Sequence, residues 1–438
     1  MAMVDATAVL VQQRRYNEPN LLDEFAALVN TAHYRVIGTY DIVAAPSAKY
    51  GIRSGKVEEI KTWIDVNKPD FVLFSPYLKS GQLFRLMEEW DTEVRDRTQV
   101  ILEIFDMHAR TQQAKLQIEQ ARLNYELPFE RHQLRMRLQK EHTGDRPIAE
   151  QIGAGEDLLN LRVHEIRRRI ALISDKLEKI SESQALLKKQ RDSKGFIEIA
   201  LAGYTNAGKS TLHNALTGSG VEIAGELFTT LSTKAAELNM PGRHIVLSDS
   251  VGFISNLPHA LLEAFNTTLM EIGSADIIIL VVDASDQVEE MNRKIRACLD
   301  TFSEIGANGV SIIAALNKID LLDESSIASR SELLKDISSS VIPISAKNKT
   351  NLDGLLRSIE KALPRLWRYA IALPYGDEGM SLLSWLHEAA VIESESYTED
   401  SIQVIALLDV EAEQKLSRLL PVTSLQRVQA SSKAATAV

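Results

Sequence analysis

The stretch GYTNAGKSTLHNALT, residues 203–217, is the feature that most limits the folds open to this chain. Its spacing, G-x-x-x-x-G-K-S, follows the apolar run FIEIALA and leads directly into a helical pattern. In such a loop the glycines let the backbone wrap a phosphate, so that N–H groups and the start of the following helix face the anion. Lys209 is then expected to reach the outer phosphates, and the Ser210 hydroxyl to ligate magnesium. The stretch predicts a strand, a phosphate-binding loop and a helix of an α/β domain.

The identity of the nucleotide rests on two short motifs further along the chain. IIAALNKID is an apolar run that ends at Asp320, and VIPISAKN is another that contains Ala346 near its end. The Asp320 carboxylate can accept from both the ring N1–H and the 2-amino group of guanine, whereas adenine lacks that amino group. The Ala346 amide can donate to the guanine O6. Because both motifs close strands, where α/β sheets bind ligands, the nucleotide is predicted to be GTP or GDP.

Two further segments are expected to sense the third phosphate. HIVLSDSVGF is a strand pattern in which Asp249 supports the magnesium shell and the Gly252 amide meets the γ-phosphate. GELFTTLSTK lies between the phosphate-loop helix and that strand. A threonine there can give magnesium its hydroxyl only when GTP is bound. Thr230 is the expected ligand, and Thr229 is the competing candidate.

Two residues near these motifs bear on the rate of hydrolysis. Phe253 follows Gly252 at the position where Ras-like enzymes carry a glutamine that orients the attacking water. Phenylalanine cannot hydrogen-bond to water, so intrinsic hydrolysis is expected to be slow, or the water is held by another group or by a partner. Asn206, within the phosphate loop, can bind potassium beside the phosphates; the alternative is that its side chain braces the loop.

The expected site combines all of these motifs, with Mg²⁺ as cofactor and K⁺ as a candidate second cation. The expected magnesium ligands are Ser210, Thr230 and Asp249, and Lys209, Thr230 and Gly252 are expected to act in hydrolysis. The nucleotide-binding residues are expected to be Gly203, Tyr204, Thr205, Asn206, Ala207, Gly208, Lys209, Ser210, Thr211, Phe228, Thr229, Thr230, Leu231, Ser232, Asp249, Ser250, Val251, Gly252, Asn317, Lys318, Asp320, Ser345, Ala346 and Lys347.

The chain as a whole divides into segments of different character. Its 438 residues are too many for one core, and 45% hydrophobic with 25% charged residues is typical of soluble globular proteins. Residues 1–108 alternate short apolar runs with amphipathic stretches, which predicts a small α/β domain with a mostly parallel sheet. Residues 109–194 are expected to form a long helical hairpin, residues 195–366 a P-loop GTPase domain, and residues 367–438 a small α+β module.

The hairpin is predicted from helical periodicity and from one loop. Pro128 predicts a kink or break in the first helix. HTGDRPIAEQIGAGED, residues 142–157, predicts a loop at the tip. We favour packing between the two helices over a separate dimerisation coil as the role of the apolar seam in the second helix. That seam keeps 4-3 spacing, broken only at Gln184, through Leu159, Val163, Ile166, Ile170, Ile173, Leu177, Ile180 and Leu187.

Charge is unevenly distributed along the chain. The net charge is −11, yet residues 109–194 hold 18 Lys and Arg against 13 Asp and Glu. A basic segment in an acidic protein fits either a polyanionic partner or a solvated helical face. The single cysteine, Cys298, argues against a disulfide framework and a cysteine-built zinc site. With no secretion signal at the N-terminus and no apolar run near the ~20 residues of a membrane span, a cytoplasmic location is expected.

With these motifs in hand, the chain resembles the HflX family of translation-associated GTPases over nearly its full length. The chain resembles the family's GTPase domain in four stretches, GYTNAGKSTLHNALTG, LFTTLS, SDSVGFISNLPHALLEAFNTTLMEI and VVDASD. It resembles the family's N-terminal signature in YGIRSGKVEEI. The segment leading into the family's hairpin is matched by VRDRTQVILEIFDMHARTQQAKLQIEQARLNY. The family's C-terminal module is matched by LPYGDEGMSLLSWLHEAAVIESESYTED. Two places depart: Gly153-Ala154-Gly155-Glu156 stands where the family's hairpin loop carries G-P-G-E, and Arg53 stands where glycine is common.

The resemblance implies binding to the large ribosomal subunit, with the N-terminal and hairpin regions on ribosomal RNA near the peptidyl transferase centre. The chain is expected to be a monomer. It also implies dissociation of ribosomes in a GTP-dependent way. The alternative is a regulatory or ribosome-assembly GTPase that does not split ribosomes. The basic hairpin is consistent with RNA, whose phosphates contribute most of such affinity. The candidate RNA contacts are Arg162, Arg167, Arg168 and Arg169.

Overall fold

The computed structural model describes residues 6–141, 148–193, 196–218, 234–240, 243–250, 252–255, 272–307 and 309–428, with the backbone alone at 133–141, 148–160, 192–193, 388, 411 and 422. The chain divides into two compact units, and the division falls inside helix α6 (Ile148–Ser193), between Glu182 and Ser183. Each unit is described by itself below.

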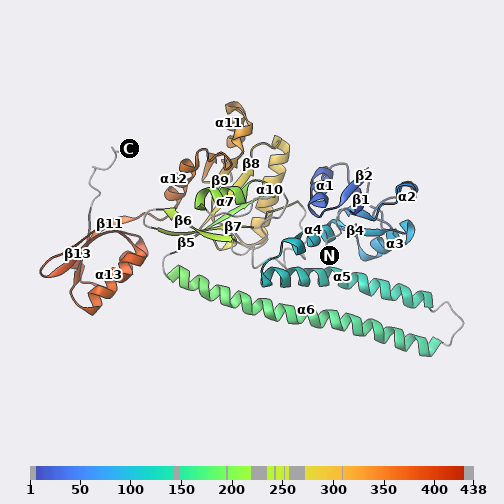
Figure 1. The fold of residues 1–438 in the computed structure, drawn as a ribbon, viewed down its shortest axis with the longest axis horizontal. Helices are drawn as coiled ribbons and strands as arrows, with labels where there is room; N and C mark the ends of the chain where they lie inside the picture. The colour runs from blue at the N-terminus through green and yellow to red at the C-terminus, as the bar shows by residue number, and fades with distance from the viewer. Residues whose placement is uncertain are drawn as a thin grey trace. The chain divides into compact units, whose positions relative to one another are not determined.

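The first unit is built on a four-stranded sheet in the order β2-β1-β3-β4, and every strand pair is parallel, as predicted (Figure 1). The central strands β1 and β3 are buried on both faces, which is why they read as continuous apolar runs. Helices α2 and α3 pack on one face with Val9, Val72 and Phe74, and α1 and α4 cover the other face. The elements are β1 (Thr7–Arg14), α1 (Leu22–Thr31), β2 (Arg35–Val43), α2 (Ser54–Asn67), β3 (Phe71–Ser75), α3 (Ser80–Trp90), β4 (Glu93–Asp96) and α4 (Arg97–His108).

The predicted hairpin is formed by α5 (Gln112–Glu141) and α6. Two local expectations differ from the structure: there is no break at Pro128, where a kink stays a prediction, and the loop expected over residues 142–157 is helical from Ile148. Helix α5 continues through Pro128 without a break. Proline lacks the backbone N–H of one helical hydrogen bond, and contacts of neighbouring residues offset this loss. Tyr125 hydrogen-bonds to Asp96, and Phe129 packs on the first unit's core. Helix α6 already begins at Ile148, so the GAGE sequence lies inside it rather than in a loop. A helical glycine costs only about 1 kcal/mol relative to alanine, and this helix is 46 residues long.

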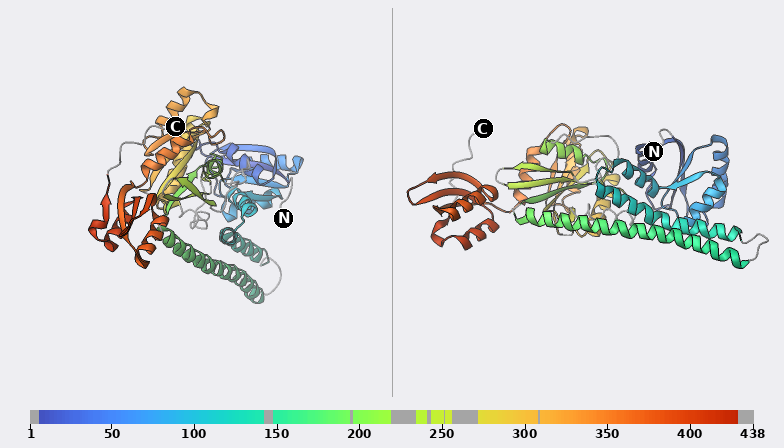
Figure 2. Two further views of the ribbon diagram at one scale, coloured as in Figure 1. Left: turned by 60° about the vertical axis from the view of Figure 1, so that its left-hand side comes forward. Right: turned by 60° about the horizontal axis from the view of Figure 1, so that its bottom comes forward.

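Part of the apolar seam of α6 is buried within the chain, and its role in packing between the two helices rather than in a dimerisation coil stays a prediction. Figure 2 shows α5 and the facing part of α6 side by side in both views. Arg169 of α6 makes a two-pronged ion pair with Glu119 of α5, at 2.7 and 3.1 Å. Leu187, by contrast, is 56% exposed, so the seam does not extend to the end of the helix. Among the side chains that the structure describes, the buried residues of the hairpin are Ala114, Leu116, Gln117, Ile118 and Ala121 on α5 and Val163, Ile166 and Ile173 on α6.

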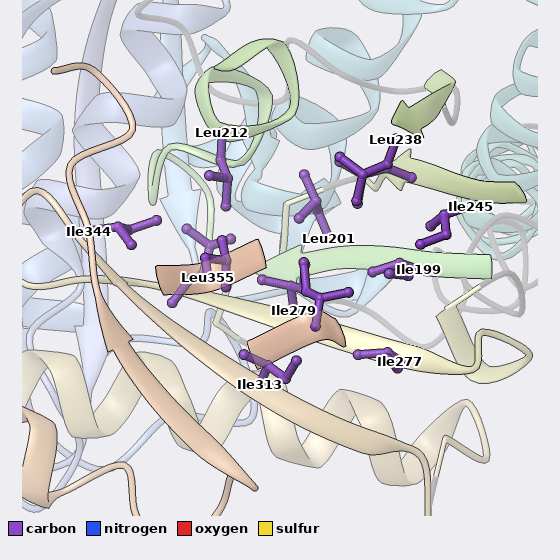
Figure 3. Packing of buried hydrophobic residues seen from close by; sticks show 14 of the residues in the cluster. Ile199, Leu201, Leu212, Leu238, Ile245, Ile277, Ile279, Ile313, Ile344 and Leu355 are labelled. Atoms are coloured by element: carbon purple, nitrogen blue, oxygen red, sulfur yellow. The ribbon is translucent and has the colours of Figure 1, made fainter. Parts of the chain in front are cut away.

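The second unit contains a six-stranded sheet in the order β10-β9-β8-β5-β7-β6, parallel except for the edge strand β6. Helices α7 and α12 bury Leu212 and Leu355 in a cluster with Ile199, Ile279 and Ile313 of the sheet (Figure 3). The elements are β5 (Ile197–Gly203), α7 (Lys209–Thr217), β6 (Lys234–Met240), β7 (Arg243–Asp249), β8 (Ile277–Asp283), α10 (Val288–Glu304), β9 (Ser311–Asn317), the 3-10 turn η1 (Ile319–Leu321), α11 (Glu324–Glu332), β10 (Ser340–Pro343) and α12 (Leu352–Ala362).

Helix α10 lies against β5 and β8 and buries Met291, Cys298 and Phe302. Cys298 is 2% exposed, and burial raises the pKa of its thiol to about 12. The thiol is therefore neutral and sequestered at physiological pH.

The C-terminal part of the second unit is an antiparallel sheet in the order β12-β13-β11-β14 with α13 and α14 packed on it. Strand β13 alternates buried and half-buried residues because helices cover only one of its faces. This sheet and its two helices agree with the α+β module expected for residues 367–438. The elements are β11 (Trp367–Pro374), α13 (Asp377–Ala389), β12 (Val391–Tyr397), β13 (Ser401–Leu408), α14 (Val410–Leu419), η2 (Val422–Ser424) and β14 (Leu425–Arg427).

These parts confirm the predicted fold class: a small α/β domain, a helical hairpin, a phosphate-loop α/β domain and an α+β module. The domain limits expected at residues 108, 194 and 366 stay predictions. Among the helices that the structure describes, none combines the length and the apolar character that crossing a membrane requires.

Candidate nucleotide-binding site

The phosphate loop joins β5 to α7, and two of its glycines hold backbone conformations that side chains rarely adopt. Gly203 has φ +148° and Gly208 has φ +96°. A Cβ on Gly203 would lie 2.3 Å from the carbonyl oxygen of Val281, and one on Gly208 would lie 2.3 Å from Nδ2 of Asn317. Both positions therefore exclude any side chain, and the loop turns tightly into the N-terminus of α7.

Lys209, the first residue of α7, is folded back over this loop. Its ammonium donates to the carbonyl oxygens of Gly203, at 3.1 Å, and Tyr204, at 2.9 Å. The side chain is buried, and desolvation lowers the pKa of Lys209. Gly252 lies beside it, since a Cβ there would be 2.9 Å from Lys209 Nζ and 2.8 Å from Thr205 Cγ2. The two residues expected to contact the terminal phosphate are thus brought together.

Ser210 and Asp249 form a pair of oxygen donors at the start of α7. The Ser210 hydroxyl donates to Oδ2 of Asp249 at 2.6 Å, and Asp249, at the end of β7, is fully buried. Magnesium prefers oxygen ligands and takes one or two from a protein, with waters and substrate phosphates completing the shell. The described residues contain no cluster of three or more His, Cys, Asp or Glu that would form an all-protein metal cage. The pair fits a magnesium ion shared with a nucleotide.

Asn317, at the end of β9, joins three loops of the site. Its amide donates to the carbonyl oxygen of Ala207 in the phosphate loop at 2.8 Å. Its Oδ1 accepts from the backbone N–H of Ala346 at 2.9 Å. The Ala346 amide, expected to face guanine O6, is therefore engaged with Asn317 here. Ser345 in turn donates to Oδ1 of Asp320 at 2.6 Å, which orients the carboxylate expected to read the base.

Asp283, at the end of β8, belongs to the same edge of the sheet but is absent from the predicted set. It pairs in register with Asn317 and forms a 2.5 Å ion pair with Lys318, whose backbone has φ +68°. The signal in the sequence is its position: it ends an apolar strand next to the strand that carries the NKID motif.

The remaining predicted site residues fall into three groups. Asn206 is exposed with φ +63°, Thr211 is half-buried and Lys347 is exposed. Ser250 is buried and donates to the carbonyl oxygen of Leu201 at 2.5 Å. Those that lie outside the described residues are Phe228, Thr229, Thr230, Leu231, Ser232 and Val251.

Phe253, at the position of the water-orienting glutamine, points into the core. It is 2% exposed and makes an edge-to-face contact with Phe302 of α10, with ring centroids 5.7 Å apart. Its backbone pairs with the phosphate loop, donating to the carbonyl oxygen of Gly203 and accepting from the N–H of Thr205. This side chain therefore cannot orient a water in the site.

The four candidate RNA-binding arginines differ in how they are engaged. Arg162 pairs with Glu165 on the same helix at 2.9 Å, and Arg169 pairs with Glu119. Arg167 and Arg168 are exposed, and within the described part of the chain neither forms an ion pair. The charge of these two is the least compensated of the four.

Three family models match the chain in succession. They are described as GTP-binding GTPase N-terminal, over residues 19–106, GTP-binding GTPase Middle Region, over residues 108–191, and 50S ribosome-binding GTPase, over residues 198–318. A GTPase HflX from Thermococcus kodakarensis is 36% identical over 386 residues, which cover 86% of each chain. This chain belongs to the HflX family of GTPases. The resemblance drawn from its motifs is thereby confirmed, and the protein is a GTP-hydrolysing enzyme.

Other relatives extend the comparison. A GTPase HflX from Caldanaerobacter subterraneus subsp. tengcongensis is 35% identical over 403 residues, covering 91% of this chain and 90% of its own. A GTP-binding protein from Sulfolobus solfataricus, solved in complex with GDP, is 29% identical. That likeness covers 82% of this chain and 98% of the other with a TM-score of 0.44, so the assignment to HflX rests on the sequence relatives.

Proposed function

We propose that this HflX protein binds GTP or GDP, hydrolyses GTP, and uses that cycle to associate with the large ribosomal subunit and to dissociate ribosomes. The observation that carries the nucleotide part is the junction at Asn317, which ties the phosphate loop to the segment around Ala346. The support for the ribosomal part is the match of residues 198–318 to a 50S ribosome-binding GTPase model.

The phosphate end of the site is proposed to bind as follows. Backbone N–H groups of the loop and the N-terminus of α7 face the phosphates, and Lys209 compensates their charge. Ser210 and Asp249, with Thr230 as the third ligand, would hold Mg²⁺, which neutralises charge on the transferred phosphate. Gly252 is proposed to donate its amide to the γ-phosphate, because its place beside Lys209 leaves no room for a side chain.

The base is proposed to be guanine, read by Asp320 and Ala346. The Ser345 hydroxyl holds one carboxylate oxygen of Asp320, which fixes the plane of the group toward a ligand with two neighbouring donors. Lys318, held by Asp283, is proposed to line the same pocket, together with Lys347.

Hydrolysis is proposed to depend on a partner. With Phe253 buried against Phe302, the usual glutamine is replaced by a residue that cannot touch the water. Ribosomes or large subunits are proposed to supply the missing contribution, and K⁺ beside Asn206 is proposed to add positive charge at the phosphates. Arg167 and Arg168 are the proposed contacts with RNA phosphates, because their charges are least compensated.

Sedimentation separates this proposal from its alternative. The full chain is incubated with intact ribosomes and GTP, a non-hydrolysable GTP analogue or GDP, and the mixture is resolved on a sucrose gradient. Free subunits are expected to accumulate with GTP and with the analogue, but not with GDP. The matched control is Lys209→Ala, which is expected to abolish tight GTP binding and splitting while leaving the fold intact. Co-sedimentation without subunit release would instead support a regulatory or assembly GTPase.

A further inference from the structure

A second set of contacts connects the phosphate loop with residues 252–255 and with α10. Tyr204, the residue after Gly203, is 4% exposed, and its hydroxyl accepts from the backbone N–H of Ser255 at 2.7 Å. The same hydroxyl shares a hydrogen bond of 2.8 Å with the Ser255 side chain. The phosphate loop is thus bonded through a side chain to the segment that follows Gly252.

Arg293 of α10 completes this group, which we call the Tyr204 cluster (Tyr204, Ser255 and Arg293). Its guanidinium donates to Ser255 Oγ and lies 3.4 Å from the Tyr204 hydroxyl. Glu290, one turn earlier on α10, holds the guanidinium through two hydrogen bonds of 2.8 and 2.5 Å. These two hydrogen bonds fix the orientation of the planar guanidinium group, which donates to Ser255.

The backbone adds a second connection between the same two segments. Thr205 N–H donates to the carbonyl oxygen of Phe253 at 2.8 Å, and Phe253 N–H donates to that of Gly203 at 3.1 Å. Gly252 lies immediately before this bridge, with Lys209 Nζ 2.9 Å from where its Cβ would be. Residues 252–255 are consequently held at both ends against the loop that binds phosphate.

We propose that the Tyr204 hydroxyl and Arg293 are positioning groups for GTP hydrolysis: they hold Ser255, and with it the Gly252 amide, at the terminal phosphate. This rests on the role proposed above for Gly252. Binding of the α- and β-phosphates needs only the loop backbone, Lys209 and α7, none of which requires a hydroxyl at position 204. The Tyr204 cluster therefore acts on the GTP state and on turnover, and GDP affinity is independent of it.

The test uses Tyr204→Phe, which keeps the ring and removes only the hydroxyl, and Arg293→Ala. We expect kcat for GTP to fall about tenfold in each, the size expected for losing one well-aligned hydrogen bond to a charged network. Affinity for a fluorescent GDP and the Tm are expected to stay near wild-type values, while affinity for a non-hydrolysable GTP analogue falls. Arg293→Lys, which keeps a charged donor, is expected to recover part of the rate.

The matched control is Arg296→Ala, an exposed arginine one turn along the same helix, which is expected to leave every readout unchanged. Combining Tyr204→Phe with Ser255→Ala is expected to cost less than the sum of the single changes, because both act on one network. Equal losses of GDP and analogue affinity, or unchanged kcat in Tyr204→Phe, would overturn the proposal. If the wild-type chain bound no guanine nucleotide, the proposed function itself would fail, which is a different outcome.

Discussion

At the scale of single residues, the site depends on a side chain that is not expected to touch the phosphates. Asn317 bonds to Ala207 and to Ala346, so it fixes the phosphate loop relative to the segment that is proposed to read the base. An asparagine can do this because one amide both donates and accepts. Neither an aspartate nor a leucine of similar size offers both functions.

Asn317→Ala is therefore expected to weaken GDP binding by more than tenfold, since it releases the phosphate loop from the segment around Ala346 and removes the donor to the buried carbonyl oxygen of Ala207. The measurement is a titration with a fluorescent GDP, with Tm followed alongside. Asn348→Ala is the control, because Asn348 is exposed in the neighbouring loop. Equal affinity in the Asn317 variant and the control would contradict the role of this junction.

A dependence of hydrolysis on the monovalent cation is predicted at Asn206. Its position in the loop, exposed and with φ +63°, leaves the amide oxygen accessible to a monovalent ion. GTP turnover is expected to be several-fold faster in KCl than in NaCl at matched ionic strength, and Asn206→Ala is expected to remove the difference. Indifference of the wild-type rate to the cation would rule out potassium activation.

At the scale of elements, Asp96 joins α5 of the hairpin to the sheet domain within the first unit. Its carboxylate caps α4 by accepting from Thr98 and Gln99, and it also accepts from the N–H of Leu78 and the hydroxyl of Tyr125 on α5. The residue is fully buried, and burial raises the pKa of Asp96 to about 6. A raised carboxyl pKa means that the folded state binds more protons than the unfolded state between about pH 4 and 6.

The stability of the first unit is accordingly expected to fall as pH rises through that window. Asp96→Asn, which cannot ionise, is expected to flatten this dependence at the cost of lower stability throughout. Hydrogen exchange of the α4 amides, corrected for intrinsic rates, measures the effect from pH 4.5 to 6.5. Asp106→Asn, an exposed change on the same helix, is expected to keep the wild-type decline, and an unaltered decline in the Asp96 variant would refute the assignment.

The helices and strands also show how much of the fold could be predicted from the sequence. Local periodicity was sufficient for the parallel sheet of the first unit and for both hairpin helices, because each has a repeated pattern of apolar residues. It failed at Pro128 and Gly153, where contacts or continuity outweighed the local preference for a break. The phosphate-loop, NKID and SAK motifs were predictable because each is contiguous. Asp283 and Tyr204 were not assigned their partners, since those partners are far along the chain and meet only in the fold.

At the scale of the whole molecule, charge is concentrated where the chain is expected to meet RNA. Only part of the hairpin's positive charge is available, because Arg162 and Arg169 are committed to Glu165 and Glu119. Arg167 and Arg168 stay exposed on the same helix. The net charge of the segment alone overstates its capacity to bind phosphate.

Replacing both Arg167 and Arg168 by glutamate is expected to lower affinity for large subunits by at least tenfold and to reduce the slope of its salt dependence. GTP turnover without ribosomes is expected to stay unchanged, because these residues lie outside the nucleotide site. Sedimentation with subunits at several salt concentrations measures the effect. As a comparison, Arg162→Glu is expected to cost less, and equal losses in both variants would argue against selective contact.

The buried thiol of Cys298 has a practical consequence for following the whole protein at work. A thiol that is 2% exposed, with a pKa of about 12, reacts slowly with maleimides, so these reagents label the native chain very little. A cysteine introduced at an exposed position can then carry a dye without prior removal of the native one. A donor and an acceptor placed in the two units would let single molecules report their separation as GTP is bound, hydrolysed and released.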